Sequence, residues 1–367
     1  MDFNFTAEQD EAAELAAKIL GDRATNDRQK QIEAAGSRFD SDLWRDLAEA
    51  GLVSLAVPEE YDGAGLGLVE LCRVLVEVGR TLGPVPLAVH GPVSLLLAEL
   101  GTDAQRSTWL PGMAAGTSIA TAAVTEERAH LPARPTVVAR PAGDGWLLSG
   151  SKSIVRAGAV ADLVLVTAST DDGVGVFLLD PTAAGVDKIE QRTSDRDVVV
   201  SLDLLSAPAE LLGALDGAGA TRLGQLLTVC GAAEQLGVTE GALKLTASYA
   251  KVREQFGRPI GTFQAVSQRL ADGYIDVLGQ RLTLWQAVWR LAEGLPAEVE
   301  VATAKLWAAD AGHTLAHTTV HVHGGVGIDL DGEAHRFFTT AKRFELLFGG
   351  ATEQALTIGR ALAAEPV

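Results

Sequence analysis

The first third of the chain repeats its apolar positions with the period of an α-helix. Thr6-Ala-Glu-Gln9 has the form of a capping box, so a helix is expected to begin directly after it. Ser41 stands where it can cap a second helix over residues 42–50. After a glycine-rich loop at residues 58–67, the helical period resumes over residues 68–82. The pattern therefore predicts a helical region at the start of the chain.

From about residue 119 the pattern changes to short alternating or β-branched runs separated by turns. Five such runs are expected to be strands, at residues 120–124, 136–139, 145–155, 162–167 and 174–179. Asp144-Gly145 and Asp172-Gly173 are typical of the turns between strands. From about residue 217 the helical period returns, with a long helix through Phe256, another over 262–291 and a third that Pro296 opens. The order is therefore helical, β, helical.

Composition narrows the class of protein. The chain has 367 residues, of which 47% are hydrophobic and 21% charged, and it contains no run of 18 apolar residues that would predict a membrane span. Thirty basic and 48 acidic residues give a net charge of −18, which disfavours nucleic acid and anionic membranes as partners. The start Met1-Asp-Phe-Asn-Phe5 lacks the features of a signal peptide, so we expect a cytoplasmic protein. Cys72 and Cys230 lie in separate apolar stretches and are expected to be buried free thiols.

The most informative stretch lies between the first two C-terminal helices. There Gly257, Pro259 and Gly261 interrupt the backbone and leave a cationic corner. Arg253 falls in the expected last turn of the first helix, where a cation suits the helix dipole, so a helix-end charge alone would account for it. A guanidinium at such a corner can also bind phosphate oxygens in a forked geometry that lysine lacks.

The wording of this stretch resembles the signature of the flavin-dependent acyl-CoA dehydrogenases. It reads Tyr249-Ala-Lys-Val-Arg-Glu-Gln-Phe-Gly-Arg-Pro-Ile-Gly-Thr-Phe-Gln-Ala-Val266. Further similarity in the segments 44–67 and 323–327 extends the resemblance over essentially the whole chain. The resemblance implies an α+β fold of that family, with an N-terminal helical domain (1–117), a small middle β-barrel or sheet domain (118–216) and a C-terminal four-helix bundle (217–367).

The resemblance also implies a binding site for FAD, shared across a subunit interface. By matching positions, Arg253 would bind the FAD pyrophosphate, Phe256 would pack beside the cofactor, and Gln255 and Gln264 would supply polar contacts. His323-Gly-Gly-Val-Gly327 resembles the family's Gly-Gly loop, in which glycine permits close approach of the backbone. The glycines concerned are Gly324 and Gly325, and His321 stands where the family often has glutamine.

Against this, the residue that would act as catalytic base is missing. The reaction of the family needs a carboxylate to remove the proton next to the thioester carbonyl. Gly349 occupies its usual position, and the alternative position on the long helix falls at Thr246-Ala-Ser248. Glu345 and Glu353 each lie four residues from Gly349, so either is a candidate for a displaced base, although Glu345 reads more simply as an exposed helix residue.

The middle domain departs from the family pattern as well. Thr125-Glu-Glu-Arg-Ala-His-Leu-Pro132 lacks the small residues that line the flavin and acyl chain, and Lys152-Ser-Ile-Val-Arg-Ala-Gly158 lacks the aromatic residue and the threonine expected against the flavin ring. His313, His317 and His321 are spaced four residues apart, a spacing at which two histidines on one helix face can bind one metal ion. The outer pair would lie roughly 12 Å apart along a helix, too far to share one ion, and we expect no metal there.

Together these features resemble the non-catalytic β-subunits of heteromeric α2β2 acyl-CoA dehydrogenases of bacterial sterol side-chain degradation. The resemblance implies a partner α-subunit that carries the base and most of the flavin pocket, and a steroid CoA thioester as substrate. The electron acceptor stays open, with an electron-transfer flavoprotein as one candidate. Two alternatives stay open. One is a self-sufficient homotetrameric dehydrogenase with a displaced base, and the other is a scaffold that binds no cofactor.

Overall fold

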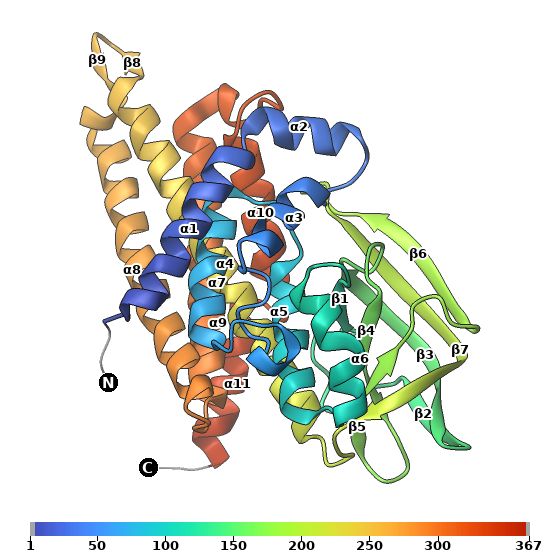
Figure 1. Ribbon diagram of the computed structural model, residues 1–367. Coiled ribbons are helices and arrows are strands. Elements are labelled where there is room, and N and C mark those ends of the chain that lie inside the picture. Colours follow the sequence, from blue (N-terminus) through green and yellow to red (C-terminus); the bar gives the residue numbers. More distant parts are fainter. Residues whose placement is uncertain (1–3, 365–367) are drawn as a thin grey trace. The chain divides into compact units, whose positions relative to one another are not determined.

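The computed structural model describes residues 4–364 and shows helical, β and helical segments in chain order (Figure 1). The chain forms two compact units. One consists of residues 1–35, 72–84 and 231–367, and the other of residues 36–71 and 85–230. The predicted order of elements is confirmed, whereas the domain boundaries after residues 117 and 216 stay a prediction.

The first unit is helical. Its helices are α1 (Ala7–Arg23), α2 (Asn26–Ala34), the later part of α4 (Leu68–Thr81), most of α7 (Ala218–Val252), α8 (Gln264–Ala292), α9 (Glu298–His323), α10 (Ala334–Leu346) and α11 (Ala351–Ala364). The predicted capping box opens α1, because the Thr6 hydroxyl accepts a bond from the Gln9 amide and the Gln9 side chain accepts one from the Thr6 amide. Two short strands, β8 (Glu254–Gln255) and β9 (Arg258–Pro259), form a hairpin beyond the end of α7 (Figure 1).

Glycines allow α4 and α7 to cross with their backbones in contact. A Cβ on Gly237 would lie 1.9 Å from the Val76 carbonyl oxygen, and one on Gly79 would lie 1.8 Å from the Glu234 carbonyl oxygen. No other residue type fits at such a crossing. In the sequence, the helical stretch that becomes α7 is apolar and rich in small residues, which is typical of a helix that packs closely against another.

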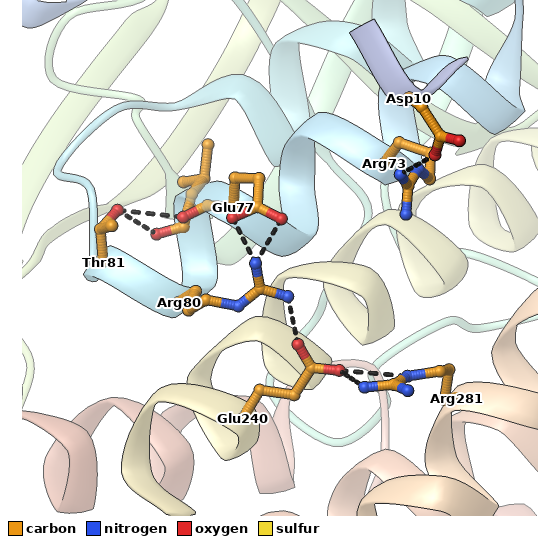
Figure 2. A network of polar contacts seen from close by, with 8 residues as sticks. Asp10, Arg73, Glu77, Arg80, Thr81, Glu240 and Arg281 are labelled. Carbon is orange, nitrogen blue, oxygen red and sulfur yellow. Dashed lines mark hydrogen bonds and ion pairs between the residues drawn. The ribbon is translucent and has the colours of Figure 1, made fainter. Parts of the chain in front are cut away.

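A chain of ion pairs flanks this crossing (Figure 2). Arg80 of α4 pairs with Glu77 of the same helix and with Glu240 of α7. Glu240 in turn accepts a 3.2 Å bond from Nε of Arg281 on α8. Burial raises the pKa of Glu77 above its usual value, and Arg80 offsets only part of that rise. The network therefore connects three helices with alternating charge.

The second unit holds the β-domain. Its helices are α3 (Ser41–Glu49), α5 (Leu87–Leu100) and α6 (Asp103–Ala114), together with the start of α4, the first part of α7 and the short 3-10 helix η1 (Glu59–Tyr61). Its strands are β1 (Ala120–Ala123), β2 (Val138–Ala142), β3 (Gly145–Arg156), β4 (Leu163–Ser169), β5 (Val174–Leu179), β6 (Val186–Arg192) and β7 (Val198–Leu212). The strand order is β1-β4-β2-β3-β7-β5, and β5 pairs again with β4. The pairing therefore closes into a small barrel around buried aliphatic side chains and Phe177.

Two expectations about individual elements were wrong, and two strands were not predicted. The side chain that caps α3 is Asp40, which accepts bonds from the amides of Asp42 and Leu43, and not that of Ser41. The helix α7 ends at Val252 and does not reach Phe256. Strands β6 and β7 were not predicted. Strand β6 is charged and mostly exposed and has no apolar face. Within residues 4–364, no helix is long and apolar enough to cross a membrane.

Candidate functional site

The hairpin after α7 presents an arginine and an aromatic ring to solvent. Its two ends are joined by a 2.8 Å bond from the Ile260 amide to the Arg253 carbonyl oxygen. Phe256 and Gly257 form the turn with φ of +54° and +74°, the pair of positive φ angles that a two-residue hairpin turn requires. A phenylalanine is strained in this region of φ, and its side chain is 91% exposed. We refer to residues 253–260 as the Arg253 hairpin.

The two arginines of this hairpin differ in their surroundings. The Arg258 guanidinium lies 4.3 Å from the centre of the Phe263 ring. The Arg253 guanidinium is exposed and has no hydrogen bond or ion pair within the described part of the chain. The expected place of Arg253 in the last helical turn is corrected, because it follows the end of α7 by one residue. The Arg253 guanidinium is therefore available to an anionic ligand at this corner.

Gln255 and Gln264 are exposed on the same corner. The Gln255 side chain donates a 2.8 Å bond to the Glu254 carbonyl oxygen, while Gln264 is the first residue of α8. Both amides point to solvent in the hairpin region, and neither is part of a buried network.

The predicted Gly-Gly loop forms the short helix η3 (Gly324–Ile328) directly after α9. Gly324 has a φ of +64°, and a Cβ on Gly324 or Gly325 would meet no atom within 4 Å. In contrast, a Cβ on Gly327 would lie 2.7 Å from the Val320 carbonyl oxygen, so Gly327 is needed for packing. His321 is exposed near the end of α9. The backbone thus has open space beside it at Gly324 and Gly325, whereas Gly327 packs against the end of α9.

The turn between α10 and α11 holds Gly349 in a fixed conformation. Its φ is +96°, and a Cβ there would lie 2.8 Å from a carboxylate oxygen of Glu353. The Gln354 side chain donates a 2.9 Å bond to the Phe348 carbonyl oxygen, which fixes the turn. No side chain extends from the position where the family carries its base, but the Glu353 carboxylate lies beside it.

Glu345 is engaged in ion pairs and is not the exposed residue that we expected. Its side chain is only 19% exposed, pairs with Lys342 and lies 3.1 Å from Nδ1 of His313. Burial pushes the pKa of Glu345 up, but the bonds from Lys342 and His313 outweigh this effect and leave the pKa below its usual value. A paired carboxylate with a lowered pKa is a weak base. At the alternative base position, Thr246 is buried and its hydroxyl lies 3.1 Å from that of Thr319.

In the β-domain the two altered motifs are joined by a buried ion pair. Nζ of Lys152 lies 2.8 Å from a carboxylate oxygen of Glu126 and donates a 3.1 Å bond to the Thr167 hydroxyl. Burial lowers the pKa of Lys152 to about 8, although Glu126 opposes the shift. Ile154, which stands in place of the family's aromatic residue, has a φ of +54° and is 45% exposed. Sequence reasoning missed the ion pair, because no spacing rule connects positions 126 and 152.

Two histidines of α9, His313 and His317, lie together on the surface. The centres of the His313 and His317 rings lie 4.5 Å apart. Burial and the neighbouring His313 and Lys342 lower the pKa of His317. Among the residues that the structure describes, no three His, Cys, Asp or Glu side chains are arranged to hold a metal ion.

Comparison with known proteins identifies the family to which this chain belongs. The chain matches the family models "Acyl-CoA dehydrogenase, N-terminal domain" over residues 6–117 and "Acyl-CoA dehydrogenase, C-terminal domain" over residues 228–363. Acyl-CoA dehydrogenase FadE27 of Mycobacterium tuberculosis is 43% identical over 376 residues, which cover 100% of each chain. The chain belongs to the acyl-CoA dehydrogenase family.

Two solved structures are similar along nearly the whole chain. A chain of the ChsE4-ChsE5 complex from Mycobacterium tuberculosis is 43% identical, with a TM-score of 0.95 over 100% of both chains. A chain of the Tcur3481-Tcur3483 steroid ACAD G363A variant is 42% identical, with a TM-score of 0.93 over 97% of this chain and 98% of that one. The fold predicted from the sequence, that of the acyl-CoA dehydrogenases, is therefore confirmed.

Acyl-CoA dehydrogenases use FAD, and the fold is shared with a glutaryl-CoA dehydrogenase from Mycobacterium smegmatis in complex with FADH2. That structure is 22% identical, with a TM-score of 0.89 over 99% of this chain and 96% of that one. In this chain, the exposed guanidinium of Arg253 suits a phosphate group, and the open space around Gly324 and Gly325 suits a close approach of the backbone to a ligand. The roles of Arg253, Gln255, Phe256, Gln264, His321, Gly324 and Gly325 stay predictions.

Proposed function

We propose that this acyl-CoA dehydrogenase is the non-catalytic subunit of a heteromeric enzyme and completes the FAD site of a catalytic partner. The observation that carries the proposal is the contrast within the helical unit. The Arg253 hairpin presents an exposed guanidinium to solvent and the Gly-Gly loop has open space beside its backbone, whereas no carboxylate extends from Gly349. A chain with a cofactor-binding surface and no base of its own is useful only beside a second chain that supplies one.

In this assignment the Arg253 guanidinium would hold the pyrophosphate, the open backbone at Gly324 and Gly325 would approach the cofactor, and Phe256 would cover it. Gln255, Gln264 and His321 would supply polar contacts. When bound, FAD supplies the hydride acceptor for α,β-dehydrogenation of a CoA thioester. The partner would remove the α-proton, because neither Gly349 nor the ion-paired Glu345 offers a free carboxylate. This chain would thus bind and orient the cofactor.

The similar structures support a partner and a substrate class. One of them is a complex of ChsE4 with ChsE5, and another is a steroid ACAD. By analogy we propose an α2β2 assembly with a catalytic α-subunit, a steroid side-chain CoA thioester as substrate and an electron-transfer flavoprotein as acceptor.

The first prediction concerns the chain alone and in its assembly. Expressed alone, it should be colourless and should not dehydrogenate CoA thioesters, because it lacks a base and much of the flavin pocket. Co-purified with its partner, it should form a yellow assembly with one FAD per heterodimer. Flavin absorbance and protein stoichiometry measure both. Stoichiometric FAD together with turnover in the chain alone would overturn the proposal.

A second candidate function is favoured by one observation. The Glu353 carboxylate lies beside the position of a Cβ on Gly349, so a self-sufficient dehydrogenase with a displaced base has a carboxylate in the right neighbourhood. Glu353 belongs to the exposed first turn of α11, and its carboxylate accepts no hydrogen bond among the described residues, although it interacts electrostatically with the buried Lys305. Turnover by the isolated chain would favour this candidate.

The second prediction concerns Arg253. In the assembly, Arg253→Ala should weaken FAD binding by about 1.5–3 kcal/mol, which is roughly 10- to 150-fold, because it removes a charge-assisted bond to phosphate. The matched control is Arg258→Ala, which removes the same charge from the same hairpin but from an arginine that lies over Phe263. FAD titration of both variants provides the measurement. Equal affinities for the two variants would show that Arg253 has no special role.

A further inference from the structure

Two stacked aromatic rings connect the end of α7 with the end of α9, the two helix ends from which the Arg253 hairpin and the Gly-Gly loop continue. Tyr249, in the last turn of α7, stacks on His323, the last residue of α9, with ring centres 4.3 Å apart and an angle of 22° between the planes. The Arg253 amide bonds to the Tyr249 carbonyl oxygen at 2.9 Å, and Gly324 follows His323 directly. One ring pair therefore lies at the base of both the Arg253 hairpin and the Gly-Gly loop.

The orientation of the His323 ring is fixed from the other side. Its Nδ1 lies 2.7 Å from the Thr319 carbonyl oxygen, which can only accept, so Nδ1 carries the proton. With this bond in place, the ring cannot rotate without breaking it. Thr319 also contacts Thr246 through its hydroxyl at 3.1 Å, one turn before Tyr249 on α7. The ends of α7 and α9 are thus joined by two successive contacts that fix their register.

The far end of the loop is held independently. The Asn26 side chain donates a 2.9 Å bond to the Asp331 carbonyl oxygen, and Lys30 pairs with the Asp331 carboxylate at 3.1 Å. Residues 324–328 therefore lie between two attachments, and the ring stack is the attachment next to the open glycines. Loss of the stack would free that side of the loop while the other side stays held.

We propose that Tyr249 and His323 are positioning residues for the FAD contact, whose stacked rings set the Arg253 hairpin and the Gly-Gly loop in a fixed relation. This inference rests on the proposed function. A cofactor that contacts both elements requires them to be held together within a fraction of an ångström, and neither element has many buried contacts of its own. The rings supply this constraint without touching the cofactor.

The test, which is the third prediction, compares Tyr249→Leu with Tyr249→Phe. Leucine removes the ring, whereas phenylalanine keeps it and removes only the hydroxyl. In the chain alone, we expect Tyr249→Leu to speed amide hydrogen exchange in a peptide covering residues 324–328, with Tyr249→Phe unchanged. In the assembly, Tyr249→Leu should raise the FAD dissociation constant by about 3- to 10-fold, the range for loss of an aromatic pair, and Tyr249→Phe should restore it.

Each contrary result has a distinct meaning. Unchanged exchange in Tyr249→Leu would show that the rings do not hold the loop and would overturn the inference. Unchanged FAD affinity in Tyr249→Leu, with weakened affinity in Arg253→Ala, would overturn the positioning role and leave the proposed function standing. If Arg253→Ala also keeps its affinity, the proposed function has failed and the positioning role fails with it.

Discussion

Replacing Lys152 with methionine is expected to lower the free energy of unfolding by about 3–5 kcal/mol, since it leaves a buried carboxylate without its counter-ion. The Lys152 side chain is fully buried and that of Glu126 is 6% exposed. The Lys152 ammonium has three acceptors, which are the Glu126 carboxylate, the Thr167 hydroxyl and the Val124 carbonyl oxygen. Methionine fills a similar volume but cannot donate to any of them.

The Glu126 carboxylate has partners that keep it in place when lysine is lost. It accepts bonds from the amides of Thr136 and Val137 and from the Thr136 hydroxyl. Burial alone would raise the pKa of Glu126, but the bonds from Lys152 and Thr136 leave it below its usual value. In Lys152→Met the carboxylate is expected to remain buried with an uncompensated charge, so much of the cost should appear as a rise in its pKa.

A double variant separates the charge from the packing. Lys152→Met combined with Glu126→Gln removes both charges and keeps an oxygen that accepts from the backbone amides, so it should recover much of the lost stability. Lys188→Met on the exposed strand β6 is the matched control and should change stability little. Urea unfolding of the four proteins at pH 7 measures these differences. A double variant no more stable than Lys152→Met would contradict the ion-pair explanation.

The sequence predicted the arrangement of elements better than it predicted contacts between them. The capping box at Thr6, strand β5 and the order helical, β, helical follow from local periodicity, which acts over a few residues. The cap at Asp40 depends on which of two adjacent residues the backbone selects, and the end of α7 at Val252 depends on the pairing of residues 254–255 with 258–259; periodicity determines neither. Strand β6 lacks an apolar face because it lies at the edge of the sheet, paired with β7 only.

The candidate site shows the same division. Motif resemblance pointed to the Arg253 hairpin and the Gly-Gly loop, because the residues proposed to bind a cofactor lie within short segments. The Tyr249–His323 stack and the Glu126–Lys152 ion pair were not predicted, because each joins segments that are distant in the sequence. Both contain a residue of a recognised motif, and the structure gives these residues a supporting role that the motif does not express.

The stability of the second unit should fall as the pH is lowered from about 6.5 to about 4, owing to a buried histidine. His90 of α5 is completely buried, and its Nδ1 accepts a 3.2 Å bond from the Ala120 amide at the start of β1. The Trp44 ring lies edge-on to the imidazole at 5.1 Å. Burial lowers the pKa of His90 from 6.5 to about 4, and a backbone contact with Met113 offsets only part of the shift.

The sign of the effect follows from which state binds the proton. Below pH 6.5 the histidine of the unfolded chain becomes protonated, while that of the folded chain stays neutral until about pH 4. Protons therefore favour the unfolded state over this interval, at about 1.4 kcal/mol for each pH unit and about 3 kcal/mol in total. Above pH 6.5 the contribution of His90 to stability no longer changes with pH.

The control is His90→Asn, whose side-chain oxygen can accept from the Ala120 amide in place of Nδ1 but does not titrate. This variant should be less stable than the native chain at pH 7, because it loses the packing against Trp44. The difference between the two proteins should shrink steadily from pH 6.5 to pH 4, measured by urea unfolding at each pH. Since all other titrating groups are common to both proteins, a constant difference across this range would mean that His90 is not the group that responds to pH.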